Sequence, residues 1–195
     1  MPAARTQLDR TCALAAVAVA LGGARAAHAD PAAPITDTRN HAGLAAAGVL
    51  PTQAWRERTG PAGALLAWLD VPVSPSLTIT ARAGAIVHAP VTVTLGARAW
   101  LVEVPVLGGA RFELARLGGV RVRAGGDVGL VVTHERVSLG GITDDDTELR
   151  FASALVLGVA RGAVAVEGGP WLADLTDLDH AIGAQLTLAV RLRSW

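Results

Sequence analysis

From about residue 41 to Trp195, small apolar residues alternate with polar ones at every second position. Successive side chains of a β-strand point to opposite faces, so this pattern predicts strands. We expect eight of them, at His41–Leu50, Pro61–Val73, Leu77–His88, Ala97–Arg116, Val120–Ser138, Leu149–Ala160, Ala163–Leu172 and Ile182–Arg193. Gly108 and Gly109 predict a bulge or bend in the fourth strand. Ten to twelve shorter strands would also fit if the fourth and fifth segments fold back at their glycines.

The breaks between these segments are alternately short and long. The short breaks are Ser74–Ser76, Leu117–Gly119 and Arg161–Gly162. The long ones are Pro51–Gly60, Ala89–Gly96, Leu139–Glu148 and Ala173–Ala181. Short turns on one side and long loops on the other, joining an even number of antiparallel strands, are typical of outer-membrane β-barrels.

Each predicted strand has two unlike faces. In the last one, Ile182, Leu186 and Val190 share a face, and Gln185 and Arg191 lie on the other. A soluble sheet would turn the apolar face inward, whereas a membrane barrel turns it to lipid and the charges into its lumen. The polar faces also carry Gly and Ala, and the chain has only two Phe, which is few for a soluble core of this size. The sequence therefore predicts an all-β, eight-stranded antiparallel up-and-down transmembrane β-barrel.

Residues 1–29 have the pattern of a secretory signal peptide. Arg5 and Arg10 precede the apolar run Ala13–Leu21, and Ala27–Ala29 is an A-x-A cleavage site. The apolar run is shorter than the roughly 20 residues that a membrane-spanning helix needs. We expect residues 30–40 to form a flexible periplasmic lead-in and residues 41–195 to form the barrel, exported to the cell outer membrane.

Composition narrows the possible partners. Residues 30–195 contain 14 Arg, 16 acidic residues and neither Lys nor Cys. The slightly negative charge argues against a nucleic-acid partner. The absence of Cys excludes disulfides and thiolate metal sites in this part of the chain.

Three stretches resemble a known family: Leu101–Arg116, Val120–Thr133 and the final Gly183–Trp195. They are similar to the small eight-stranded outer-membrane β-barrel proteins of Gram-negative bacteria, the OmpA-like transmembrane barrels in the broad sense. The resemblance implies outer-membrane lipid and the barrel-assembly machinery as partners, the latter recognising an aromatic residue at the end of the last strand. Trp195 fits that role, although Arg191 and Arg193 share its face.

Four tryptophans are candidates for aromatic girdles at the two membrane interfaces. Trp55, Trp100 and Trp171 lie near the long-loop ends of strands, and Trp195 lies at the opposite end. The alternative is that Trp residues fall near strand ends by chance, since Trp68 is not terminal.

The charged residues on the polar faces are expected to meet inside the barrel. The candidates for this lumen network are Arg82, Glu103, Arg111, Glu113, Arg121, Arg123, Asp127, Arg150, Glu167 and Arg191. An eight-stranded barrel is just wide enough for side chains to fill it, and unpaired burial of ions is costly. We expect Arg111, Arg121 and Arg123 to pair with Glu103, Glu113, Asp127 and Glu167 and to close the lumen. A narrow ion path is the alternative.

No arrangement of residues indicates catalysis. A deacylase needs a hydroxyl nucleophile beside a His, but His88, His134 and Ser138 come without a G-x-S-x-G elbow. The run Asp144–Asp146 lacks EF-hand spacing. We predict no catalytic residue, cofactor or metal.

The predicted role is structural or in surface interaction, with an unknown surface partner. A soluble periplasmic β-sandwich or lipocalin-like binding protein is the first alternative. A lipid-modifying enzyme embedded in a barrel is the second.

Overall fold

The computed structural model describes residues 38–56, 58–176 and 182–195. All of the described residues belong to one compact unit. The predicted signal peptide and most of the lead-in therefore lie outside the described residues. No helix in the described ranges is long and apolar enough to cross a lipid bilayer.

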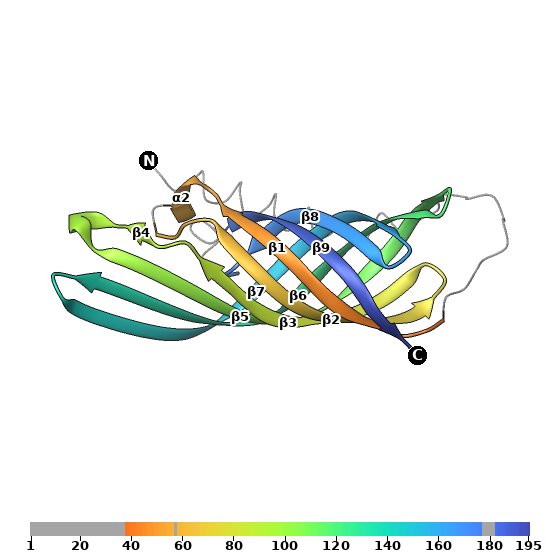
Figure 1. Cartoon of the computed structure of the whole chain (residues 1–195), viewed down its shortest axis with the longest axis horizontal. Helices are drawn as coiled ribbons and strands as arrows, with labels where there is room; N and C mark the ends of the chain where they lie inside the picture. The colour runs from red at the N-terminus through yellow and green to blue at the C-terminus, as the bar shows by residue number, and fades with distance from the viewer. Residues whose placement is uncertain (1–37, 57, 177–181) are drawn as a thin grey trace. The chain divides into compact units, whose positions relative to one another are not determined.

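The described part of the chain consists almost entirely of strands (Figure 1). They are β1 (His41–Pro51), β2 (Ala62–Ser74), β3 (Leu77–His88), β4 (Val91–Thr92), β5 (Arg98–Leu117), β6 (Val120–Leu139), β7 (Ile142–Arg161), β8 (Val164–Leu172) and β9 (Ile182–Ser194). Two short helices, α2 (Gln53–Arg56) and η1 (Thr94–Gly96), lie in the first two long connections. Seven of the eight predicted strands match to within a residue or two at each end.

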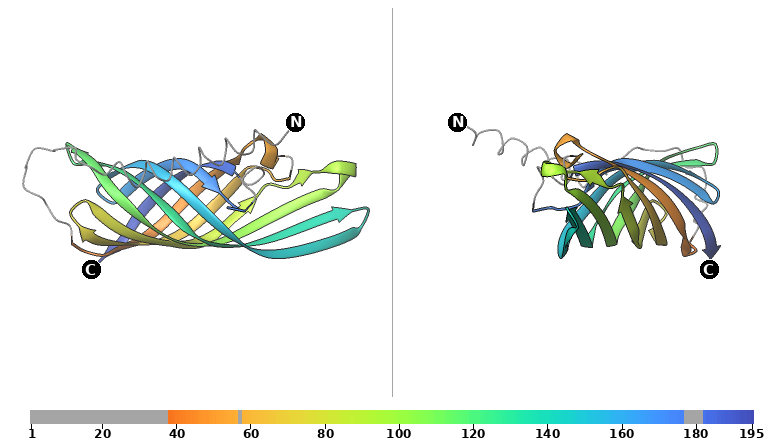
Figure 2. Two further views of the ribbon diagram at one scale, coloured as in Figure 1. Left: turned by 180° about the vertical axis from the view of Figure 1, so that it is seen from behind. Right: turned by 60° about the vertical axis from the view of Figure 1, so that its left-hand side comes forward.

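The strands close into a ring. Each long strand pairs antiparallel with its neighbour, and β1 pairs with β9 from His41↔Ser194 to Pro51↔Gly183. The ring continues across the short β4 because β3 pairs directly with β5. Figure 2 shows the strands crossing the barrel at a tilt. The predicted eight-stranded antiparallel up-and-down fold is confirmed, and pairing is continuous through Gly108 and Gly109, so no strand folds back.

Two local predictions were wrong. The bulge of β5 lies between Glu113 and Ala115 rather than at Gly108–Gly109. The expected long loop Leu139–Glu148 is a tight turn, since β6 and β7 remain paired up to Leu139↔Ile142. Gly140 and Gly141 have φ angles of 58° and 87°, and two consecutive residues with positive φ make the hairpin turn whose twist matches paired strands.

The connections between the strands alternate between the two ends of the barrel. The turns after β2, β5 and β7 lie at the same end as the C-terminus of β9, and the β6–β7 turn lies at the other (Figure 1). We call these the short-turn end and the long-loop end. At the short-turn end, the backbones of Asn40 and Trp195 bond to each other in both directions, at 3.0 and 3.1 Å.

Burial alternates along the strands as period two requires. Outward Leu65, Val106, Val128 and Leu186 are each more than 60% exposed. Inward Glu103, Arg111, Asp127 and Glu167 are at most 2% exposed. The charged faces point into the barrel, which is opposite to what a soluble sheet with an apolar core requires.

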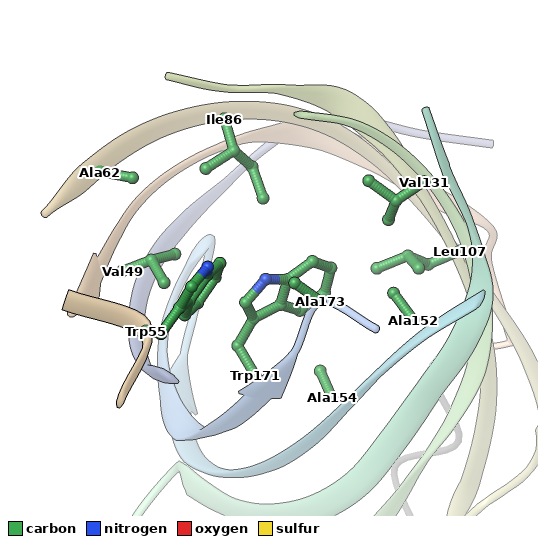
Figure 3. Close-up of a cluster of buried hydrophobic side chains, with 10 residues drawn as sticks. All are labelled: Val49, Trp55, Ala62, Ile86, Leu107, Val131, Ala152, Ala154, Trp171 and Ala173. Carbon is green, nitrogen blue, oxygen red and sulfur yellow. The ribbon is translucent and has the colours of Figure 1, made fainter. Parts of the chain in front are cut away.

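An apolar layer fills the interior toward the long-loop end (Figure 3). It comprises Val49, Trp55, Ala62, Ile86, Leu107, Val131, Ala152, Ala154, Trp171 and Ala173. The indole rings of Trp55 and Trp171 point into the ring of strands, and Trp171 is 1% exposed. Small residues form most of the layer because the interior is narrow and two indoles already occupy it.

Candidate functional site: the charged interior of the barrel

A two-bond ion pair in the interior joins β5 and β6. Arg111 donates from Nη1 to Asp127 Oδ1 at 2.8 Å and from Nη2 to Asp127 Oδ2 at 2.7 Å. Both side chains are almost completely buried. Two parallel bonds between a guanidinium and a carboxylate form the strongest geometry available to this pair.

Glu167 of β8 is the second anchor. It accepts hydrogen bonds from Arg82 at 2.5 Å, from Arg123 at 3.1 Å and from Arg111 at 3.4 Å. Arg123 also lies 3.6 Å from Asp70. These six residues, Arg82, Arg111, Arg123, Asp70, Asp127 and Glu167, are the lumen cluster. Its three cations and three anions balance, which offsets the cost of burying them.

Three inward-facing glycines make room for the cluster. A Cβ on Gly109 would collide with Asp127 Oδ1, one on Gly125 would lie 2.9 Å from Arg111 Cδ, and one on Gly158 would lie 2.7 Å from Glu167 Cγ. Each glycine thus lies where a long charged side chain crosses the lumen. The mixture of Gly and charge on the polar faces follows from this packing.

Five residues predicted for the network lie apart from the lumen cluster. Arg150, near the long-loop end, is 31% exposed and bonds to Glu148 at 2.6 Å, so the structure does not bring it to the lumen cluster. Glu113 bonds to Arg116 near the short-turn end. Arg191 donates to the backbone oxygen of Gly162 at 2.9 Å. The remaining two, Glu103 and Arg121, also differ from the expected pairing.

Glu103 lies beside a histidine rather than an arginine. His88 Nε2 is 3.4 Å from Glu103 Oε2, and both side chains are almost completely buried. His88 Nδ1 is 3.0 Å from the carbonyl oxygen of Gly60, to which it donates. Among the described residues, neither His88 Nε2 nor either carboxylate oxygen of Glu103 has a hydrogen-bond partner. The parity of β3 already places His88 on the inward face, but nothing in the sequence indicates its partner.

Arg121 has no hydrogen bond or ion pair among the residues that the structure describes. Its charged neighbours are Arg123, Glu113, Arg116 and Arg191. The expected pairing of Arg121 with an acid of the lumen was therefore wrong.

Two of the four predicted interface tryptophans are interior residues. Trp55 is 5% exposed and Trp171 is 1% exposed, and both belong to the apolar layer. Trp171 has the same parity as Glu167 on β8, so it points into the lumen, and Trp55 lies in α2, which folds over the barrel mouth. Trp100 and Trp195 are 36% and 54% exposed, near opposite ends of the barrel.

The strands β6 and β7 continue past the barrel as a hairpin. We call residues 134–148 the outer extension; it holds five acidic residues and one arginine. Arg136 bonds to Asp145 at 2.6 and 3.1 Å, and His134 bonds to Thr147 at 2.9 Å. In the described part of the chain, Ile142–Arg150 pairs with no strand besides β6, because the β7–β8 ladder begins only at Ser153.

The residues considered for catalysis do not form a site. His88 lies inside the barrel, whereas His134 and Ser138 lie on the outer extension with Thr147 and Thr143 as partners. Within the described ranges, no three His, Cys, Asp or Glu residues are grouped as metal ligands.

No protein-family model and no curated protein matches the sequence. Solved structures do match. Ail, the attachment invasion locus protein of Yersinia pestis, aligns with a TM-score of 0.53 and 10% identity over 78% of this chain and 95% of Ail. The fold is that of the small eight-stranded outer-membrane β-barrels.

Two further structures have similar coverage. Ail in complex with the heparin analogue sucrose octasulfate has a TM-score of 0.50 and 11% identity over 78% of this chain and 95% of that one. Neisserial surface protein A has a TM-score of 0.45 and 12% identity over 79% and 95%. The likeness to Ail supports the barrel architecture; the charged interior described above comes from this chain's own residues.

Proposed function

We propose that this protein is an outer-membrane β-barrel with a closed lumen that displays the outer extension for surface interaction. The observation that carries the proposal is the inverted distribution of polarity. Exposed Leu and Val cover the outside of the ring, while charged residues fill its inside. Soluble monomers rarely expose apolar surface on this scale, whereas lipid solvates it.

The exposed tryptophans are suited to the edges of the membrane. Trp100 lies on the outer face near the long-loop end, packed edge-on against His134 with ring centroids 6.3 Å apart. Trp195 is at the short-turn end. Indole rings favour the headgroup region, so these two residues would mark its two borders. Short turns face the periplasm in such barrels, so the outer extension would face the exterior.

Membrane insertion is tested by gel mobility. The protein, extracted from membranes in mild detergent, is run boiled and unboiled. A shift that appears only on boiling is the expected result, because a closed barrel resists detergent until heated. Recovery in the soluble periplasmic fraction, with no shift, would contradict insertion and place the apolar faces in a core.

The closed lumen is supported by two barriers in series. The lumen cluster crosses the middle of the barrel, and the apolar layer with Trp55 and Trp171 fills the part nearer the long-loop end. We expect no stepwise conductance in planar bilayers above that of protein-free lipid. Arg82→Ala combined with Trp171→Ala shortens side chains in both barriers and serves as the matched variant. Conductance steps in the wild type would overturn the closed lumen.

The outer extension supports a role in surface interaction. It combines an excess of acidic residues with an edge of β7 that pairs with no described strand, and an exposed edge can accept an additional strand from another chain. The partner that fits is an extended segment with positive charge.

This role is tested on whole cells. A thiol-specific reagent that does not cross membranes should label Ser138→Cys but not Ser76→Cys at the short-turn end. Cells carrying the wild type should bind a fluorescent cationic peptide, and binding should fall with salt and in the Asp144→Asn, Asp145→Asn, Asp146→Asn variant. The neutral change Thr143→Ala on the same hairpin is the control. Equal binding by all variants would overturn the role.

A further inference from the structure

A cavity opens at the short-turn end, between the lumen cluster and the short turns. Its volume is about 230 Å³, and it is lined by the turns around Ser74–Ser76 and Gly162–Val164 as well as by inward side chains. Pockets for drug-sized ligands have volumes of about 300–1,000 Å³, so this space suits a smaller molecule or a single chemical group.

The lining is rich in arginine. Six arginines line the cavity, Arg82, Arg111, Arg116, Arg121, Arg123 and Arg191, against three acids, Asp70, Glu113 and Glu167. The deeper arginines belong to the lumen cluster, and Arg116 bonds twice to Glu113, at 2.9 and 3.0 Å. These contacts occupy the acids of the lining.

Arg121 forms no ion pair with any of these acids. No described residue forms a hydrogen bond or an ion pair with it, and three of its four charged neighbours are arginines. A half-buried guanidinium among like charges is electrostatically unfavourable unless an anion joins it. The repulsion gives the cavity affinity for negative charge.

The cavity wall between Arg121 and Arg191 consists of alanines, whose short side chains leave the space open. In the strand register Arg121 lies opposite Ala160, Ala160 opposite Ala165, and Ala165 opposite Ala189. All three alanines line the cavity. Arg191 follows Ala189 by two positions on the same face, and its bond to the oxygen of Gly162 holds it at the turn. A shelf of methyl groups therefore separates two guanidinium groups.

We propose that this cavity binds a phosphate group, with Arg121 as its principal donor. The planar guanidinium presents paired N–H donors that match phosphate oxygens, and a compact oxyanion fits the available volume. The group could belong to a soluble phosphate compound or to a lipid headgroup at the inner surface of the membrane. The inference needs the folded barrel and is independent of what the outer extension binds.

The test uses the full chain, folded in an uncharged maltoside detergent, with inorganic phosphate as the probe. Titration calorimetry and the unfolding temperature are measured with phosphate and with chloride at matched ionic strength. The wild type should bind phosphate and gain unfolding temperature from it. Arg121→Gln should lose about tenfold or more of the affinity, as expected for one charge-assisted contact. Arg161→Gln, at the same end but outside the cavity lining, should behave as the wild type.

Folding of the variants is checked by the boiled-against-unboiled gel shift. Arg121→Gln relieves repulsion from Arg123, so it should fold at least as well as the wild type without phosphate. Should it not fold, Arg121→Lys keeps the charge without the paired donors and should bind more weakly than the wild type.

A second experiment distinguishes a lipid headgroup from a soluble phosphate compound as the source of the phosphate group. A short-chain phosphatidic acid, kept below its micelle concentration, replaces inorganic phosphate. Tighter binding of the lipid indicates a headgroup, and equal binding indicates a soluble source. An equal response to chloride, or unchanged affinity in Arg121→Gln, would overturn the site.

Discussion

Arg111 and Asp127 form a two-bond ion pair across β5 and β6 in the middle of the barrel, with Nη–Oδ distances of 2.8 and 2.7 Å. They are not directly opposite in the strand register, since Arg111 faces Gly125 and Asp127 faces Gly109. The pair therefore runs diagonally, and each member lies over a glycine. The arrangement ties two strands together through side chains as well as through the backbone ladder.

Removing one charge of this pair should be costly. Asp127→Asn leaves Arg111 buried with a weaker partner, and breaking a buried ion pair costs about 3–5 kcal/mol. The measurement is urea-induced unfolding in lipid vesicles. Asp145→Asn is the control, because solvent screens its exposed pair with Arg136, so losing that pair should change stability little. Equal losses in both variants would contradict a special role for the lumen cluster.

The glycines beside the cluster should resist substitution. Gly158→Ala would bring a methyl group against the backbone oxygen of Val166 and within 2.7 Å of Glu167 Cγ, so Glu167 must shift. We expect about 1–3 kcal/mol of destabilisation in the same unfolding assay, as for overpacking elsewhere. Gly63→Ala, where a Cβ meets nothing within 4 Å, should be within about 1 kcal/mol of the wild type.

The interior indole should matter more than the exterior one. Trp171→Ala empties part of the apolar layer and should cost about 3–5 kcal/mol, as large-to-small changes in cores do. Trp100→Ala loses mainly its edge-on contact with His134, worth about 0.5–1.5 kcal/mol. Acrylamide in solution should likewise quench the fluorescence of Trp171 less than that of Trp100. A larger loss of stability for Trp100→Ala than for Trp171→Ala would mean that Trp100, and not Trp171, is the interior residue.

A charge on the outer face should be tolerated in the extension but not in the barrel. Val128 faces outward near mid-barrel and is 63% exposed. In a bilayer, Val128→Arg should cost about 2–4 kcal/mol, the cost of arginine at the midplane. Leu139→Arg, next to the hairpin turn, should change stability by no more than about 0.5 kcal/mol. An unchanged Val128→Arg variant would mean that this face does not meet lipid.

Period two explains why the strands and their faces could be predicted. Successive side chains alternate between the two faces of a strand, so alternation alone places Arg82 and Asp127 on inward faces. A shift of one residue would move every side chain of the strand to the other face. The partners within the lumen do not, because they depend on strand tilt and on which side chains reach across. Arg150 has the inward parity of β7 but lies too near the long-loop end to reach the cluster.

The missed features had partial signals. Parity on β8 places Trp171 on the face of Glu167, whereas its position near a strand end suggested an interface. Gly140–Gly141 is a pair typical of two-residue hairpin turns, but the acids that follow it suggested a loop. Trp55 had no such signal, since it lies in a connection where no period applies.

The two-glycine turn at Gly140–Gly141 also bears on the order of folding. It makes β6 and β7 a hairpin of twenty paired residues each, joined by the shortest possible excursion of the chain. Contacts between neighbours in sequence form with little loss of chain entropy, whereas His41 and Ser194 must meet across nearly the whole barrel sequence. We expect β6 and β7 to pair first, starting from their turn, and β1 and β9 to pair last. The outer extension, which reaches farthest from the barrel, would then form before the barrel itself.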